Sequence, residues 1–244
     1  MTAIKIRGLR KEYRDVVAVE GLDLDIAEGE LFALLGVNGA GKTTTVKMLS
    51  TLVKPDGGDA EILGHSVTAE PAAIKELVDV SMQETAVARN LTVAENIEFY
   101  ARLSGQTNEE AEETKKYVYS AFGLYRHAGK RASKLSGGWQ RKLSIALALA
   151  SHPKVLFLDE PTLGLDVIAR RELWETIREL RSKMTIILTT HYMEEAEALA
   201  DRIGVMKDGK LLFVGRKEEM FARTGKTNVE DAFIEIVAGG EKNA

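Results

Sequence analysis

The stretch LFALLGVNGAGKTT at residues 31–44 decides the fold. Its first five residues are continuously apolar, which predicts a short strand buried on both faces of a sheet. A glycine-rich loop follows, and a helix is predicted to begin at about Lys42 and to end near residues 54–58. Successive backbone N–H groups of such a loop converge on an anion, and the positive end of the helix dipole adds to the attraction. The order strand, glycine loop, helix therefore predicts a phosphate-binding site.

The loop matches the pattern GxxxxGK(S/T), known as Walker A, in which each fixed position has a chemical task. The glycines keep side chains out of the path of the phosphate oxygens. Lys42 is expected to reach the β- and γ-phosphates of a nucleotide, and the Thr43 hydroxyl to ligate Mg²⁺. A glycine turn in front of an ordinary helix is the alternative. The candidate nucleotide-binding residues are Gly36, Val37, Asn38, Gly39, Ala40, Gly41, Lys42, Thr43 and Thr44.

A second apolar strand, in VLFLDEP at residues 155–161, ends in two adjacent carboxylates. In nucleotide hydrolases with a phosphate loop, the aspartate at such a strand end holds the magnesium ion, so Asp159 is the candidate metal ligand. Glu160 comes next and is placed to polarise a water molecule for in-line attack on the γ-phosphate. Taken alone, Asp-Glu-Pro is a common way to end a strand. The phosphate loop upstream favours the catalytic interpretation.

Outward from these stretches, apolar strands alternate with helices, which predicts a largely parallel sheet covered by helices. Segments 3–8, 16–19 and 22–26 alternate like antiparallel strands. From about residue 83 to 132, helical spacing and charged residues dominate. The later predicted elements are strands at 155–158, 185–190 and 203–206, a helix at 167–182 and a hairpin strand at 210–214.

The chain is therefore predicted to be α/β: a P-loop NTPase core with a mostly parallel sheet, an N-terminal antiparallel β region and an inserted helical lobe. One domain is expected over residues 1–244. Its core with the β region covers 1–82 and 133–223, the helical lobe about 83–132, and a C-terminal helix or tail 224–244.

Composition excludes several classes of protein. The net charge of −4 argues against a protein that coats nucleic acid, and the basic pairs Arg141-Lys142 and Arg170-Arg171 are expected on solvated faces of mixed-charge helices. The absence of cysteine excludes disulfides and thiolate chemistry. No apolar run approaches the roughly 20 residues that span a bilayer, and the N-terminus does not look like a signal peptide. We expect a cytosolic protein, or one that docks on a membrane from the cytosolic side.

The segment LSGGWQ at residues 135–140 precedes an apolar helix. Ser-Gly-Gly at a helix start is a backbone anion site with a hydroxyl donor, although a helix cap with a glycine hinge is the simpler interpretation. The chain contains five motifs in a fixed order: the Walker A loop, this segment, VLFLDEP, the LGLD at 163–166 and the Thr190-His191 pair. In this combination the chain resembles the nucleotide-binding subunits of ABC transporters over almost its whole length.

The resemblance implies further site residues. Tyr13 resembles the aromatic residue that stacks on adenine, with a tyrosine of the hairpin core as the alternative. Gln83 resembles the glutamine that contacts Mg²⁺ and the attacking water, and His191 the switch histidine at the γ-phosphate. Residues 163–166 resemble the loop that senses the partner subunit. Trp139 departs from the Gln or Met of many relatives. The residues expected to reach the ATP of an opposing subunit are Ser136, Gly137 and Gly138.

The resemblance also implies partners. Two nucleotide-binding subunits, identical or related, are expected to sandwich two ATP molecules with Mg²⁺ and to drive a separate transmembrane permease from the cytoplasmic face of the membrane. Segments 189–202 and 228–236 are similar to the ABC-2 class, which favours export. A soluble ABC ATPase of DNA repair or translation is the alternative, and no nucleic-acid partner is expected. A stripe predicted to pack on the core comprises Val229, Phe233, Ile236 and Val237.

Overall fold

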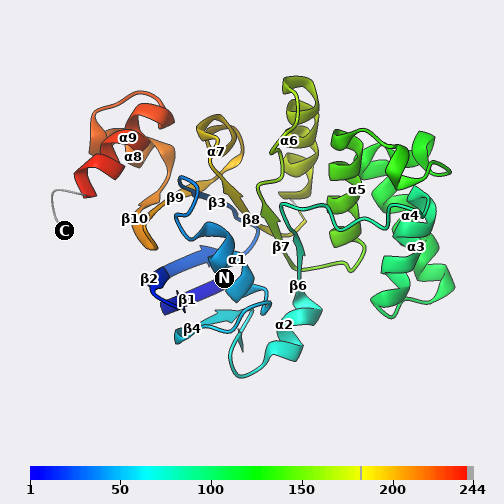
Figure 1. The fold of residues 1–244 in the computed structure, drawn as a ribbon, viewed down its shortest axis with the longest axis horizontal. Helices are drawn as coiled ribbons and strands as arrows, with labels where there is room; N and C mark the ends of the chain where they lie inside the picture. The colour runs from blue at the N-terminus through cyan, green and yellow to red at the C-terminus, as the bar shows by residue number, and fades with distance from the viewer. Residues whose placement is uncertain (182, 241–244) are drawn as a thin grey trace.

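The computed structural model describes residues 1–181 and 183–240 and contains two β-sheets flanked by helices (Figure 1). The larger sheet has six strands in the order β10-β9-β3-β8-β7-β6. The smaller has four strands in the order β2-β1-β4-β5. The α/β architecture predicted from the sequence is confirmed, with a mostly parallel central sheet and an antiparallel N-terminal sheet.

Parallel pairing links five strands of the larger sheet. All side chains of β3 (Leu31–Leu35) and of β7 (Val155–Asp159) are buried, because both faces of the sheet are covered. The carboxyl ends of these strands therefore open at one edge, where ligands bind in such sheets. The remaining strands are β6 (Val78–Ser81), β8 (Thr185–Thr190), β9 (Arg202–Lys207) and the antiparallel β10 (Lys210–Gly215).

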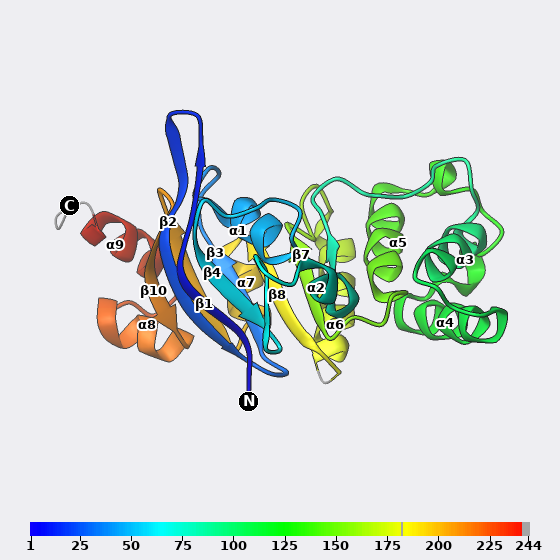
Figure 2. The same cartoon turned by 90° about the horizontal axis from the view of Figure 1, so that it is seen from below.

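The smaller sheet packs against one face of the larger sheet and lies on the side of the molecule away from α3 and α4 (Figure 2). Its strands are β1 (Thr2–Tyr13), β2 (Val16–Ala27), β4 (Gly57–Ile62) and β5 (His65–Ser66). Alternate residues of the larger sheet divide between two cores. Phe32, Phe157 and Ile187 pack with the smaller sheet and with α1 (Lys42–Leu49), whereas their neighbours in sequence pack against the helices on the other face.

Some predicted boundaries were wrong. The segments 16–19 and 22–26, predicted as separate strands, form the single strand β2 (Val16–Ala27). The helix that begins at Lys42 ends at Leu49 rather than near residues 54–58. The Ser50 hydroxyl bonds back to the carbonyl of Val46, and Thr51 adopts a φ of 59°, which the helix cannot continue. Gly57 and Gly58, expected at the helix end, begin strand β4 instead.

Helices α3 (Val93–Leu103) and α4 (Asn108–Phe122) lie together at one end of the molecule, beyond α5 (Gly137–Leu149), in both views. Capping boxes from Thr92 and Thr107 start the two helices. The lobe boundaries at 83 and 132 stay a prediction. The other helices are α2 (Pro71–Leu77), α6 (Val167–Arg181), α7 (Met193–Leu199), α8 (Lys217–Thr224), α9 (Val229–Gly240) and the 3₁₀ turns η1 (Leu124–His127) and η2 (Ala132–Lys134).

The predicted packing of the C-terminal stripe is confirmed. Val229, Phe233 and Ile236 of α9 are buried in the core beside β10, and Val237 packs against the same cluster. Over residues 1–181 and 183–240, none of the helices combines the length and the apolar character that a bilayer crossing requires.

Candidate active site

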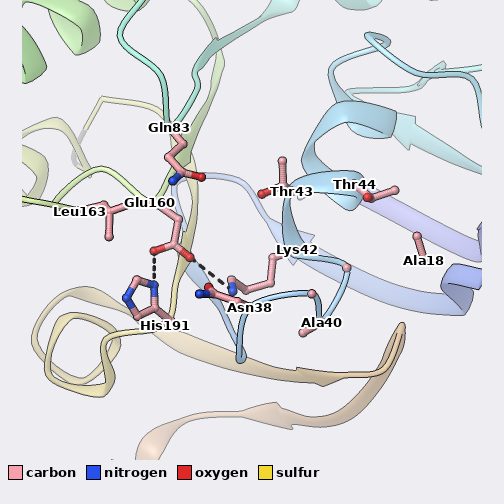
Figure 3. Close-up of a pocket in the computed structure, with 12 residues that line it drawn as sticks. Ala18, Asn38, Ala40, Lys42, Thr43, Thr44, Gln83, Glu160, Leu163 and His191 are labelled. Atoms are coloured by element: carbon pink, nitrogen blue, oxygen red, sulfur yellow. Dashed lines mark hydrogen bonds and ion pairs between the residues drawn. The ribbon is translucent and has the colours of Figure 1, made fainter. Parts of the chain in front are cut away.

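The Walker A loop lines a hollow of about 450 Å³, a size within the range of ligand pockets. Segments far apart in sequence meet there: the glycine loop and the start of α1, the end of β7, the end of β8 and the segment after β6 (Figure 3). The lining residues are Ala18, Asn38, Gly39, Ala40, Gly41, Lys42, Thr43, Thr44, Gln83, Glu160, Leu163 and His191.

At two positions of the loop, the backbone of another strand comes so close that only glycine fits. A Cβ at Gly36 would overlap the carbonyl oxygen of Met206, and one at Gly41 would overlap that of Ala18. Gly41 also has a φ of 104°, which an L-residue rarely adopts. The loop is therefore held closely against β2 and β9, and it lines the hollow together with the start of α1.

The Lys42 side chain is almost fully buried within this loop. Its ammonium donates to the carbonyl oxygens of Gly36 at 2.8 Å and Val37 at 3.2 Å. It also forms an ion pair with Glu160 Oε1 at 3.3 Å (Figure 3). The positive charge thus lies between the phosphate loop and the predicted catalytic carboxylate.

Asp159 lies fully buried beneath the start of α1. The Thr43 hydroxyl donates to its carboxylate, with both oxygens at 3.0 Å. The Thr189 hydroxyl donates to Asp159 Oδ1 at 2.5 Å from the neighbouring strand. The two predicted magnesium ligands from distant parts of the chain, Thr43 and Asp159, are therefore brought together.

Glu160 occupies an unusual backbone conformation with a φ of 50°. Non-glycine residues avoid this region, and they occupy it mainly where the surroundings fix it. Its carboxylate contacts His191 Nδ1 through Oε2 at 2.7 Å and Lys42 through Oε1 at 3.3 Å. Because the side chain is 6% exposed, these contacts hold it in a single position at the rim of the hollow.

Other predicted residues fall in different places. Gln83 lines the hollow above Thr43 and Glu160 (Figure 3). Tyr13 does not line it: the ring sits at the end of β1, is 43% exposed and lies 5.4 Å from the Lys11 ammonium. The alternative that Tyr13 is a residue of the hairpin core is therefore wrong.

Ser136, Gly137 and Gly138 line a separate hollow of about 420 Å³ at the start of α5. Gly164, Leu165 and Asp166 line this second hollow, whereas Leu163 lines the first. The LGLD loop thus connects the two hollows, and Asp166 caps α6 by accepting from the N–H groups of Ile168 and Ala169 at 2.9 Å. Within one chain, the Ser-Gly-Gly segment does not join the hollow of the Walker A loop.

The family model described as ABC transporter matches residues 19–163, more than half of the chain. The chain belongs to the ABC transporter family. The expected ATP-binding subunit of an ABC transporter, with its ATPase activity, is thereby confirmed. The daunorubicin/doxorubicin resistance ATP-binding protein DrrA of Streptomyces peucetius is 41% identical over 224 residues, which cover 91% of this chain and 68% of that protein.

Solved structures of ABC proteins agree with this assignment. CbiO1 of Clostridium perfringens, part of the ABC transporter complex CbiONQ, has a TM-score of 0.83 at 27% identity and covers 91% of each chain. A dimeric ATP-binding cassette in a post-hydrolysis state with ADP and phosphate has a TM-score of 0.79 at 25% identity. It covers 87% of this chain and 98% of that one. The predicted ABC ATPase fold is therefore confirmed.

The basic pair Arg141-Lys142 corrects one expectation about this ABC ATPase. The pair was predicted on a solvated face, but Arg141 is 3% and Lys142 is 8% exposed. Lys142 pairs with Glu172 at 2.7 Å and lies 4.7 Å from the Trp139 ring. α5 is buried almost all round, so charged residues in its first turns must find partners inside. The mostly apolar residues 143–150 that follow the pair are the feature of the sequence that indicates this burial.

Trp139, the departure in the signature segment, packs toward the helical lobe. Its ring lies 4.2 Å from that of His127, measured between centroids. Residues Ser136 to Gly138 remain at the surface of the second hollow. Trp139 lines the same hollow, so this residue takes part both in the contact between α5 and the lobe and in the surroundings of the Ser-Gly-Gly segment.

Proposed function

We propose that this chain hydrolyses Mg²⁺-ATP as one half of a dimer and drives export by a separate transmembrane permease from the cytoplasmic face. The observation that carries the proposal is that the expected ATP-binding residues of one chain line two separate hollows. One holds the Walker A loop with Glu160 and His191, and the other holds Ser136 to Gly138. In a dimer of opposed chains, each ATP is gripped by the first hollow of one subunit and the second hollow of the other.

In this proposal the loop N–H groups and Lys42 hold the β- and γ-phosphates. Tyr13 stacks on adenine from its exposed position beside Lys11. The partner's signature segment then supplies the Ser136 hydroxyl and the N–H groups at the start of α5. The γ-phosphate is what the two subunits share, so its loss on hydrolysis weakens the closed pair.

The residues fit a magnesium ion. Thr43 offers a hydroxyl, Asp159 a buried carboxylate and Gln83 an amide oxygen, and hard oxygen ligands are what Mg²⁺ requires. In the described part of the chain, no group of three or more acidic or histidine side chains forms a complete cage. That suits Mg²⁺ in nucleotide hydrolases, where phosphates and water complete the coordination. When bound, the ion neutralises charge on the β- and γ-phosphates.

Glu160 acts as the general base. Its carboxylate takes a proton from water while the water oxygen bonds to the γ-phosphorus and the bond to the β,γ-bridging oxygen breaks, giving ADP and phosphate. His191, 2.7 Å from Glu160, steadies the carboxylate and the water. Gln83 approaches the same place from the segment that leads into the helical lobe.

The permease is expected to contact the lobe. Phe99 and Leu103 are one turn apart on α3 and are 52% and 73% exposed. Two exposed apolar side chains on one side of a helix can contact an apolar helix of a membrane protein. The resemblance to the drug-resistance protein DrrA supports export as the direction.

The test compares the wild-type chain with Glu160→Gln. The wild type should release phosphate from ATP in the presence of Mg²⁺, and the variant should still bind ATP and hydrolyse it at least about 100-fold more slowly. Purification from detergent-solubilised membranes should recover a multi-span membrane protein with the chain. Wild-type hydrolysis by Glu160→Gln would remove Glu160 as the base, and stimulation by nucleic acid without a membrane partner would favour the soluble alternative.

A further inference from the structure

Arg141 is a buried charged residue to which the mechanism above gives no task. It follows the signature segment in α5 and is 3% exposed. Its guanidinium donates to four backbone carbonyl oxygens: Pro161 at 2.8 Å, Asp159 at 2.7 Å, Met82 at 2.5 Å and Gln83 at 3.1 Å. One side chain thus joins three segments that are far apart in the sequence.

The peptide unit between Asp159 and Glu160 is held at both ends. Arg141 Nη2 donates to the Asp159 carbonyl, and the Glu160 N–H donates to the carbonyl and the hydroxyl of Thr189, each at 3.1 Å. The orientation of this peptide plane sets the φ of Glu160. Since φ is 50°, a value that carries strain for a residue with a Cβ, something must hold it there.

A second donor of the same guanidinium holds the chain after Glu160. Arg141 Nε bonds to the Pro161 carbonyl at 2.8 Å. The peptide planes on either side of the Glu160-Pro161 unit are therefore fixed by one rigid, planar group. The Glu160 carboxylate is aimed at His191 and Lys42 from a backbone that Arg141 fixes on both sides.

The third donor reaches the segment that precedes the helical lobe. Arg141 Nη1 bonds to the carbonyls of Met82 and Gln83, directly after β6. The Gln83 side chain lines the active-site hollow together with Glu160. Arg141 thus fixes the backbone of both residues relative to one another.

The charge of Arg141 is balanced by backbone oxygen rather than by a direct carboxylate partner within the described residues. Burial lowers its pKa to about 10, while the nearby charges of Asp159, Glu195 and Glu160 oppose the shift. The guanidinium therefore stays protonated near neutral pH. A lysine could keep the charge but could not reproduce the fork of donors that spans these segments.

We propose that Arg141 is a positioning residue for ATP hydrolysis, which holds Glu160 in its strained backbone conformation and ties it to Gln83. The inference rests on the proposed roles of Glu160 and Gln83. It assigns Arg141 no contact with ATP, so its loss should lower the rate of the chemical step and leave nucleotide binding nearly unchanged.

The experiment measures kcat and the Kd for ATP of Arg141→Lys, with Arg178→Lys as the matched control. Arg178 lies on the exposed side of α6, and its guanidinium bonds to the Glu175 carboxylate and the Ala198 carbonyl, away from the site. Arg141→Lys should lower kcat about tenfold or more and keep Kd within about threefold, because the interaction lost acts only on the catalytic geometry. Arg178→Lys should match the wild type in both.

Two further readouts separate positioning from folding. In Arg141→Ala, guanidinium at about 10 mM, far below denaturing concentrations, should restore part of the lost kcat, and methylammonium should not. In Arg141→Lys, amide hydrogen exchange should quicken at residues 82–84 and 160–163 and stay unchanged at residues 36–43.

Wild-type kcat in Arg141→Lys would overturn the inference. So would a loss of kcat that follows a loss of thermal stability, shows no rescue by guanidinium and leaves exchange at 160–163 unchanged. Failure of the proposed function has a different signature, since Glu160→Gln would then hydrolyse ATP at the wild-type rate. Failure of this inference alone leaves Glu160→Gln inactive and Arg141→Lys fully active.

Discussion

Gly41→Ala tests whether the phosphate loop is held as tightly as the structure indicates. The residue has a φ of 104°, and an added Cβ would overlap the Ala18 carbonyl oxygen and lie 2.7 Å from Met206 Cε. The methionine tip can move. The Ala18 carbonyl belongs to the backbone of β2, between Val17 and Val19, which both pair with β1, so it has less freedom to move than the methionine tip.

The magnitude follows from two terms. The unfavourable backbone conformation costs about 1–3 kcal/mol, and the overlap with fixed backbone adds about 1–3 kcal/mol. Alanine also reduces the conformational entropy of the unfolded chain, which offsets the loss by about 0.4–1 kcal/mol. The net loss in free energy of unfolding is therefore about 1–5.5 kcal/mol, which for a chain of this size lowers Tm by about 2–20 °C.

The assay is urea and thermal unfolding without nucleotide, and the chain supplies its own controls. Gly39→Ala meets nothing within 4 Å but has a φ of 83°, so it should show only the conformational part of the loss. Gly137→Ala has neither a positive φ nor a close neighbour and should lose nothing. Equal losses in Gly41→Ala and Gly39→Ala would refute the close approach of the loop to β2.

Other predictions concern the site itself. Thr43→Ala removes the hydroxyl that donates to Asp159, so Mg²⁺ should no longer strengthen ATP binding in Kd measurements, whereas Thr43→Ser should keep the effect. His191→Ala should lower kcat about 100-fold and keep the Kd for ATP within about threefold. An unchanged kcat would show that Glu160 does not need His191 for catalysis. Burial raises the pKa of the Glu195 carboxyl above its ordinary 4.5, so its ionisation destabilises the fold as pH rises. Glu195→Gln should therefore gain free energy of unfolding relative to the wild type as the pH rises above 4.5, and a difference flat with pH would contradict this.

The sequence could predict what depends on local pattern. An all-apolar strand, a glycine loop and a helix at Lys42 follow from spacing and backbone chemistry, and the structure has them at Leu31–Leu35 and Lys42–Leu49. The carboxylate pair at the end of β7 could be placed for the same reason, because strand ends of a parallel sheet meet at one edge.

The features that could not be predicted from the sequence depend on contacts between distant segments. The apolar residues after Arg141 indicate its burial, but its partners are backbone carbonyls, which leave no mark in the pattern of side chains. Thr189 looked like any strand residue until β8 placed its hydroxyl against Asp159. Neither role could be found from a single sequence, because both depend on the order of strands in the sheet.

The division of one ATP site between two chains is tested most directly by light scattering of Glu160→Gln. The variant should run as a dimer in Mg²⁺-ATP and as a monomer in Mg²⁺-ADP, because only the γ-phosphate reaches the signature segment of the partner. Adding Ser136→Arg to this variant fills the second hollow and should keep the chain monomeric in ATP, while ATP still binds to the Walker A hollow of each monomer. An equally stable dimer in the doubly substituted chain would contradict the account, since Ser136 to Gly138 would then have no part in gripping the nucleotide.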